Sequence, residues 1–430
     1  MTEAVPLPTP VPPPSSGHRF AYLDGVRGLA ALMVAFSHYT LAFHPALMGG
    51  GPRMAHFTAS VALSQTPLIF LINPELGVAI FFVLSGFVLA SSVAGRDTPF
   101  AALAVRRWVR LGVPILGSTL LIWPLVQWHL FFTREAGPLT LSDWLGGNYL
   151  WVGFMDNSLL RLVWQSLFDI FLRARNQYNP ALWTMPTEFW GSLGLFACYC
   201  GLRRWMAVPG VAFGVAVVAL GAVWQTAYFG FPCGVALFEA RRLLLRLSLA
   251  RQAAMAPLAA PVGVALLAAG VLLGGTPYLI DLGAHGQYAR LFIAMAAWFD
   301  NPVLLLHRVG AVCVVAAALL WRPMQMFLTT RACQFLGRVS FMLYLVHVPI
   351  LCSLIAGLLL QLAPVIGYDG ATAVLLPVFL GMVFLVADIT TRLFDAPAIG
   401  LSHRAGRAVA AGIARMMARW RPSAGITPVT

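Results

Sequence analysis

Residues 74–94 read PELGVAIFFVLSGFVLASSVA, a run whose only charged side chain is Glu75. An α-helix needs about 20 mainly apolar residues to cross the hydrocarbon core of a bilayer. A helix also satisfies its backbone hydrogen bonds within the segment, which lipid cannot do for it. This stretch therefore predicts a transmembrane helix.

Similar apolar runs recur along the chain. The segment at 229–245 is the weakest of them, because charged residues at 239–242 interrupt it. Segment 287–300 is apolar but is flanked by Tyr288 and Asp300, so we expect it to be interfacial or re-entrant. The predicted fold class is an all-α, polytopic bundle of about ten transmembrane helices, near residues 24–44, 74–94, 111–131, 181–202, 207–227, 229–245, 256–274, 303–321, 340–361 and 371–393.

The composition excludes a soluble globular protein. Hydrophobic residues make up 60% of the 430 residues and charged residues 10%, whereas a soluble domain is about a quarter charged. The net charge is +13, and every basic residue is an arginine. The arginines lie at the ends of apolar runs and form no stripe of the kind that binds nucleic acid. The expected partner is therefore the lipid bilayer, and no nucleic acid is expected.

The arginine distribution predicts an orientation. If the N-terminus lies inside, 21 of the 28 arginines fall in inner segments, which agrees with the positive-inside rule. Ten spans then place both termini inside. We expect a multi-pass protein of the inner or plasma membrane of the cell.

The domain organisation follows from the same pattern. Residues 1–17 are Pro-rich and predict a disordered tail, 18–397 form the transmembrane domain, and 398–430 form a basic cytoplasmic tail. Within that tail, 402–421 predicts an amphipathic helix on the inner leaflet. The long outer loop 132–180 is rich in Trp and Asp and is expected to cover a site from outside. The cysteine spacing predicts no metal site.

Ionisable residues at membrane depth are costly and mark functional sites. In the first predicted span, Asp24 and Arg27 can pair at i, i+3. His38 follows Arg27 by eleven residues, about three turns, so the two side chains share a helix face. The alternative for His38 is a histidine that is simply hydrogen-bonded to a neighbouring helix.

Two further segments carry polar groups near the predicted inner surface. Arg106 and the i, i+3 pair Arg107 and Arg110 favour phosphate binding, although a topology signal alone would also explain them. In the second span, Ser85-Gly86 favours close helix packing, with a direct role for Ser85 as the alternative.

Later spans add a carboxylate and a polar stripe. Glu188 follows Trp183 in an apolar run and needs a partner; His38 would make an acid–base pair, and a structural carboxylate at a Pro186 kink is the alternative. Ser340, Tyr344 and His347 share one face of the ninth span, where they either line a cavity or join helices. Asp388 and Arg392 are expected to be a structural pair, at spacing i, i+4.

Six segments in order resemble the acyltransferase-3 family of integral membrane acyltransferases, over about residues 20–397. Arg27 and His38 resemble the opening pattern, and Arg107 and Arg110 resemble the inner-face R-x-x-R. The other four segments are Phe81 to Leu89 (FFxxSGF), Trp183 to Glu188 (WSLxxE), Leu336 to His347 (G-x-x-S-x-x-x-Y-x-x-H) and Asp395 to Pro397 (Glu-x-Pro). Asp395 replaces the usual Glu, and Thr187 stands where Val is commoner. No hydrolase-like extracytoplasmic domain follows, so a stand-alone member is expected.

The resemblance implies transfer of an acyl group, most often acetyl, from cytoplasmic acyl-CoA to a hydroxyl of an envelope or exported glycan. Acyl-CoA would be a co-substrate, with no cofactor bound permanently. We expect His38 to be the general base or a transient acyl carrier, with Glu188 orienting it. The residues expected to bind donor or acceptor are Asp24, Arg27, Ser85, Arg106, Arg107, Arg110, Trp183, Tyr344 and His347.

A transporter or flippase is the alternative function, because it would use the same intramembrane charges. Such a protein commonly shows an inverted repeat with broken helices in both halves, and the sequence shows no such repeat. A non-catalytic scaffold would leave the paired polar residues at bilayer depth unexplained.

Overall fold

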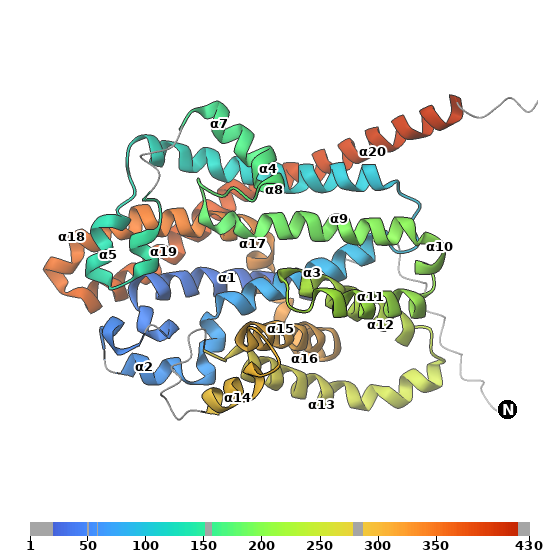
Figure 1. The fold of residues 1–430 in the computed structure, drawn as a ribbon, viewed down its shortest axis with the longest axis horizontal. Helices are drawn as coiled ribbons and strands as arrows, with labels where there is room; N and C mark the ends of the chain where they lie inside the picture. Colours follow the sequence, from blue (N-terminus) through green and yellow to red (C-terminus); the bar gives the residue numbers. More distant parts are fainter. Residues whose placement is uncertain (1–19, 50, 58, 151–156, 278–286, 420–430) are drawn as a thin grey trace, which may run out of the picture.

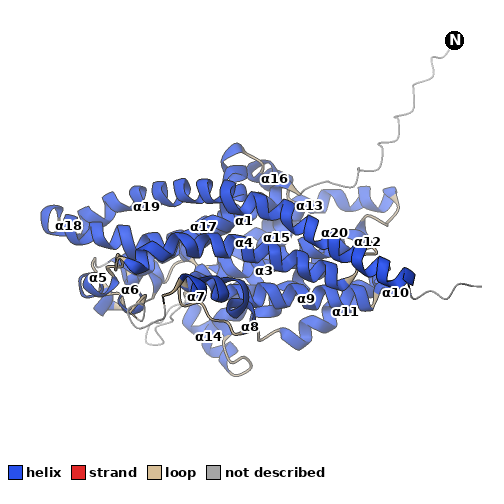
Figure 2. Ribbon diagram, turned by 90° about the horizontal axis from the view of Figure 1, so that it is seen from above, coloured by secondary structure: helices blue, strands red, loops and turns tan. Residues whose placement is uncertain are grey.

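A computed structural model describes residues 20–49, 51–57, 59–150, 157–277 and 287–419. The predicted disordered tail 1–17 lies outside these residues. The described residues form helices and connecting turns without a strand, arranged as one elongated bundle (Figures 1 and 2). The long helices are α1 (Ala21–Phe43), α3 (Pro74–Val93), α4 (Phe100–Gln127), α9 (Met185–Gly201), α11 (Pro209–Val223), α12 (Gly230–Leu244), α13 (Leu249–Gly274), α15 (Pro302–Leu320), α17 (Arg331–Ile350), α18 (Ala356–Ile366), α19 (Tyr368–Thr390) and α20 (Ala396–Arg419).

Shorter elements connect them. They are η1 (Pro45–Met48), η2 (Pro52–Met54), α2 (Ala59–Ser64), η3 (Pro67–Ile72), α5 (Thr133–Thr140), α6 (Asp143–Gly147), α7 (Leu159–Trp164), η5 (Gln165–Asp169), α8 (Ile170–Leu172), η6 (Pro180–Thr184), α10 (Arg203–Met206), η7 (Ala227–Phe229), α14 (Gln287–Ala296), α16 (Arg322–Leu328), η8 (Leu351–Ile355) and η9 (Thr391–Asp395).

Each of the ten predicted spans coincides with a helix. Seven helices of the described part are long and apolar enough to cross a membrane, and the all-α polytopic fold class is therefore confirmed. The helices α9, α11 and α12 are shorter, with 17, 15 and 15 residues. The 3₁₀ turn η6 directly precedes α9, and Pro186 lies in the first turn of α9. Pro186 thus starts this helix, where proline is tolerated, so the kink that was the alternative explanation for Glu188 is not formed there.

The last two spans are longer than predicted. The segments α17, η8 and α18 form one 36-residue helix, and α19, η9 and α20 form one of 51 residues. Each contains a π-helical stretch, η8 or η9, of the kind that often occurs at functional sites. The basic tail thus begins as a continuation of the last span, and α20 packs along α4, where Gly406 lies against the carbonyl of Ala102.

The helices α1 and α17 form the centre of the bundle and run in the same direction. Arg27 bonds to Ser340, and His38, further along α1, bonds to His347, further along α17. A parallel pair is expected for the first and ninth crossings of an alternating bundle. Glycines bring the two backbones together: a Cβ on Gly28 would lie 2.4 Å from the backbone nitrogen of Gly337. Small residues permit such contacts between membrane helices.

Replacing Gly28 by leucine is therefore expected to cost more than the roughly 1–3 kcal/mol typical of overpacking, because the obstacle is backbone. We expect Gly28→Leu to lose most of the monodisperse protein in size-exclusion chromatography in detergent. Gly214→Leu is the matched control, since no atom lies within 4 Å of a Cβ built there. Equal yields of the two variants would contradict this packing.

The chain between α4 and α9 places α5 near one end of the bundle and then runs along its flank, where α7 lies on α4 (Figure 1). Ser142, which caps α6, donates to the carbonyl of Leu41 at 2.7 Å and so ties this segment to the end of α1. Asp169 is buried and accepts ion pairs from Arg161 at 3.2 Å and Arg173 at 3.4 Å. The long outer loop is thus an ordered cover in its described part, although its residues 151–156 lie outside that part.

Candidate active site

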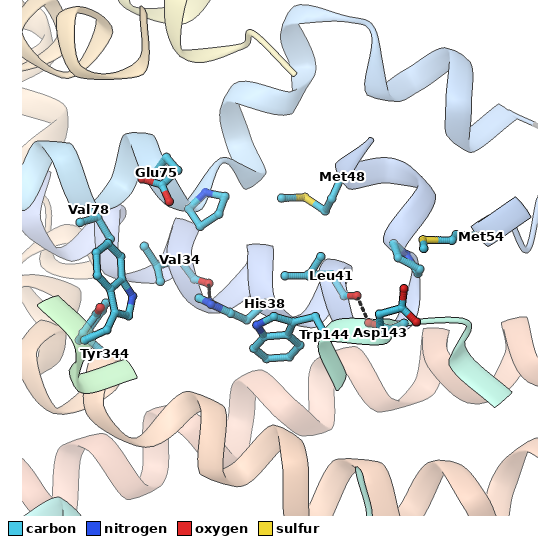
Figure 3. Close-up of a pocket in the computed structure, with 14 residues that line it drawn as sticks. Val34, His38, Leu41, Met48, Met54, Glu75, Val78, Asp143, Trp144 and Tyr344 are labelled. Atoms are coloured by element: carbon cyan, nitrogen blue, oxygen red, sulfur yellow. Dashed lines mark hydrogen bonds between the residues drawn. The ribbon is translucent and has the colours of Figure 1, made fainter. Parts of the chain in front are cut away.

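A cavity of about 420 Å³ lies beside the end of α1, under the cover formed by α6 (Figure 3). Its walls come from α1, η1, η2, α3, α6, η6 and α17. The first, fourth and ninth predicted spans contribute to the lining, and so do the second span and the cover formed by α6. The lining residues are Val34, His38, Leu41, Pro45, Met48, Met54, Pro74, Glu75, Val78, Ser142, Asp143, Trp144, Trp183 and Tyr344.

His38 stands in the cavity wall with its tautomer determined by its neighbours. Its Nδ1 lies 2.8 Å from the backbone carbonyl of Val34, one turn earlier. A carbonyl can only accept, so the neutral ring carries its proton on Nδ1 and donates it there. The other nitrogen, Nε2, then keeps its lone pair and can accept a proton. The ring packs against Trp144, with 5.1 Å between the ring centroids.

A second histidine supports the first. The Nδ1 of His347 lies 3.3 Å from the carbonyl of Leu343, which assigns its proton to Nδ1 by the same reasoning. Its Nε2 is then an acceptor, 3.2 Å from the Nδ1 of His38. The N–H of His38 thus faces two acceptors, which would also stabilise an imidazolium. His347 is fully buried behind His38, whereas it was expected in the cavity wall.

The other two residues of the predicted polar stripe on α17 are Tyr344 and Ser340. The hydroxyls of Tyr344 and Thr184 lie 3.0 Å apart, and Tyr344 lines the cavity. Ser340 accepts a hydrogen bond from Nε of Arg27 at 3.0 Å. The sequence left open whether these residues line a cavity or join helices. The structure shows both, because Ser340 joins α17 to α1 and Tyr344 lines the cavity.

Arg27 and Asp24 form the predicted pair, with 3.0 Å between the guanidinium and the carboxylate. Arg27 also donates to the carbonyl of Gly337 at 3.0 Å. Arg27 and His38 both face α17, so the prediction that they share a helix face is confirmed. The two side chains are separated by about 16 Å along the helix axis, at 1.5 Å per residue.

The expectation that Glu188 orients His38 was wrong. Glu188 forms an ion pair with Arg107 and accepts a hydrogen bond from Ser85. The hydrogen bonds of His38 go to α1 and α17. An arginine stays charged in apolar surroundings and requires a carboxylate, whereas a neutral imidazole does not. Gly86, next to Ser85, packs closely against the carbonyl of Phe231, so the close helix packing predicted for this segment is present.

The arginines of α4 are also partnered. Arg110 donates to both carboxylate oxygens of Asp395 in η9, and its guanidinium lies 5.6 Å from the ring centre of Phe341. Arg107 is held by Glu188, although its Nε is buried and has no hydrogen-bond partner in the described structure. The R-x-x-R spacing favoured phosphate binding by this pair. Because both guanidinium groups are already bound to carboxylates, neither arginine is an open phosphate site. Arg106 lies 3.1 Å from Nε2 of His403 on α20.

Eleven of the fourteen lining residues were not singled out from the sequence, and Glu75, Asp143 and Trp144 are the chemically important ones among them. Glu75 stands in the first turn of α3, and Asp143 and Trp144 belong to the cover. Glu75 could have been identified from the sequence, because it is a carboxylate inside an apolar run, and Glu188 was chosen as a candidate on that same ground. Trp183 was selected, and it lines the cavity. Asp388 bonds Arg392 as expected, and Arg338 as well.

Comparisons with known proteins show what this chain is similar to. The family model described as "Acyltransferase domain" matches residues 20–392. O-acetyltransferase PaAT-1 of Phomopsis amygdali is 25% identical over 425 residues, covering 90% of this chain and 84% of that protein. Acyltransferase R4 of Phoma sp. is 24% identical over 429 residues, covering 84% of this chain and 88% of that protein. No solved structure matches the chain.

Proposed function

Since this chain belongs to the acyltransferase-3 family and is a multi-pass membrane acyltransferase, we propose that it moves an acyl group from acyl-CoA to an alcohol, with His38 as general base. The observation that carries the proposal is the state of the His38 ring. Its Nδ1–H is engaged by the carbonyl of Val34, so the basic nitrogen is Nε2, in a side chain that lines the cavity.

The proposed reaction is a direct transfer. Nε2 of His38 takes the proton of the acceptor hydroxyl while that oxygen attacks the thioester carbonyl. The tetrahedral intermediate collapses to the ester, and the sulfur of CoA leaves with the proton from the imidazolium. While His38 is charged, its Nδ1–H still donates to Val34 and His347, so both acceptors stabilise the cation. Glu188 has no part in this step, and its role is to neutralise Arg107.

Tyr344 is the proposed donor to the oxyanion. Its hydroxyl lies in the cavity wall, 3.0 Å from the hydroxyl of Thr184. When Thr184 donates to the phenol oxygen, the phenol proton is free to bond the developing negative charge. A pre-oriented donor in a site that excludes water is the usual way in which acyl transfer is accelerated.

The proposed anchor for the phosphates of acyl-CoA is the basic end of the bundle. Arg106 bonds His403, and Arg96 and Arg407 lie close enough to this pair to interact with it electrostatically. Arginine forks suit phosphate groups, and these cations lie on the loop before α4, on α4 and on α20. The donor would thus bind at the predicted inner end, and the acceptor would bind at the opposite end beside His38.

Acetyl is the proposed acyl group, a choice that the O-acetyltransferase name of the first relative supports. The glycan acceptor that the family resemblance implies remains a proposal, and so does an inner or plasma membrane location. A lipid or a small metabolite with a hydroxyl is compatible with the same chemistry.

The test is release of free CoA from acetyl-CoA by purified protein, followed with a thiol reagent. We expect release only when an acceptor alcohol is present, with one acetyl ester formed for each thiol. Mass spectrometry of exported glycans and of extractable alcohols from cells with and without the protein identifies the lost ester. If no acetyl ester depends on the protein in either experiment, the proposed function is rejected.

A further inference from the structure

We propose that the cavity beside His38 selects a compact, mainly apolar alcohol without negative charge, and that Glu75 and Asp143 determine this choice. This inference rests on the proposed function and specifies its acceptor. It favours a small hydrophobic alcohol over a glycan chain.

The apolar walls are the first argument. Leu41, Met48, Met54 and Val78 cover several sides of the cavity. A sugar placed against them would lose water from its hydroxyls without gaining hydrogen-bond partners, which disfavours its binding. An apolar skeleton gains free energy when the same walls remove it from water.

The size of the cavity is the second argument. Its volume of about 420 Å³ lies near the lower end of the range of roughly 300–1,000 Å³ that small-molecule pockets occupy. The cover helix α6 closes over it, held to α1 by Ser142. A space of this size and shape suits one compact molecule, whereas a polymer needs an extended groove.

The charges in the walls are the third argument. Glu75 on α3 and Asp143 on α6 both line the cavity, on the walls seen in Figure 3. Among the described lining residues none is an arginine, and Arg308, which acts on Glu75 electrostatically, lies outside the lining. Glu75 is half-buried beside a partly apolar space and repels an anion more strongly than it would in water, because the effective dielectric constant is lower there. Asp143 is exposed, so water screens its repulsion and its contribution is the smaller one. They leave neutral and cationic alcohols acceptable.

The experiment uses four acceptors with acetyl-CoA and the purified protein: 1-decanol, 10-aminodecan-1-ol, 10-hydroxydecanoate and maltotriose. The first three share one chain length and differ in charge. We expect kcat/KM for the neutral and cationic alcohols to exceed that for 10-hydroxydecanoate and for maltotriose at least tenfold. Glu75→Gln should reduce the discrimination against 10-hydroxydecanoate at least threefold, and Asp143→Asn should reduce it by a smaller factor. Glu135→Gln, on the exposed surface of α5, is the control that should not change it.

The outcomes separate the two proposals. Preferred acetylation of maltotriose, or a discrimination between decyl alcohols that neither carboxylate variant changes, overturns this inference and leaves acyl transfer standing. If none of the four alcohols is acetylated and no CoA is released, the proposed function fails, and the inference fails with it.

Discussion

Replacing His38 by alanine is expected to lower kcat for acyl transfer by about 10²–10⁴-fold, the range that general acid–base catalysis supplies. The reason is that the lone pair on Nε2 is the proposed proton acceptor in a cavity where the other ionisable groups of the lining are Tyr344 and two carboxylates. The measurement is CoA release and ester formation by protein that elutes as a single peak in detergent. His129→Ala, at the exposed end of α4, is the matched histidine control.

The same variant distinguishes a base from an acyl carrier. The wild-type protein is incubated with radiolabelled acetyl-CoA in the absence of acceptor, quenched and separated from free label. Direct transfer with His38 as base leaves the protein unlabelled, whereas an acyl carrier would retain label that His38→Ala loses. Full activity of His38→Ala would remove the mechanism altogether.

The second large effect concerns stability. Replacing Glu188 by glutamine is expected to lower the free energy of unfolding by about 3–5 kcal/mol, because it leaves the guanidinium of Arg107 as an uncompensated charge. Both side chains of this pair are only 13% exposed. The loss should appear as a lower unfolding midpoint in a thermal or SDS titration of the purified protein.

An exposed ion pair provides the comparison for the stability effect of the buried pair. The side chains of Arg338 and Asp388 are 57% and 21% exposed, and such pairs contribute about 0–1 kcal/mol. Asp388→Asn should therefore shift the midpoint much less than Glu188→Gln. Replacing both members of the buried pair, with Arg107→Met and Glu188→Met, should recover part of the lost stability. If Glu188→Gln and Asp388→Asn behave alike, Glu188 does not serve as the counter-ion of Arg107.

Contacts within one helix could be predicted from the sequence. Asp24 and Arg27 pair at i, i+3, and Asp388 and Arg392 pair at i, i+4, because helix geometry alone brings these positions together. The shared face of Arg27 and His38 follows from the same periodicity. A histidine at that position could be singled out because ionisable groups are rare in apolar runs.

Contacts between helices could not be predicted in this way. Glu188 was paired with His38 on the basis of estimated depth, but its partner is Arg107, which lies 81 positions earlier in the chain. Arg110 was left open for phosphate, yet it meets Asp395 across the bundle. The choice among several carboxylates and several cations depends on which helices are neighbours, and the apolar runs that form the helices carry little information about that.

By itself, the sequence determined that this chain is a bundle of membrane helices, since apolar runs of this length leave the backbone only one way to satisfy its hydrogen bonds in lipid. It also placed His38 and Arg27 on one helix face. Only the tertiary structure decided that Nε2 of His347 faces Nδ1 of His38, and that Glu75 and Asp143 share its cavity. These relations arise where α1, α3, α6 and α17 meet, and distances across such a junction are set by side-chain packing between segments that are far apart in the chain.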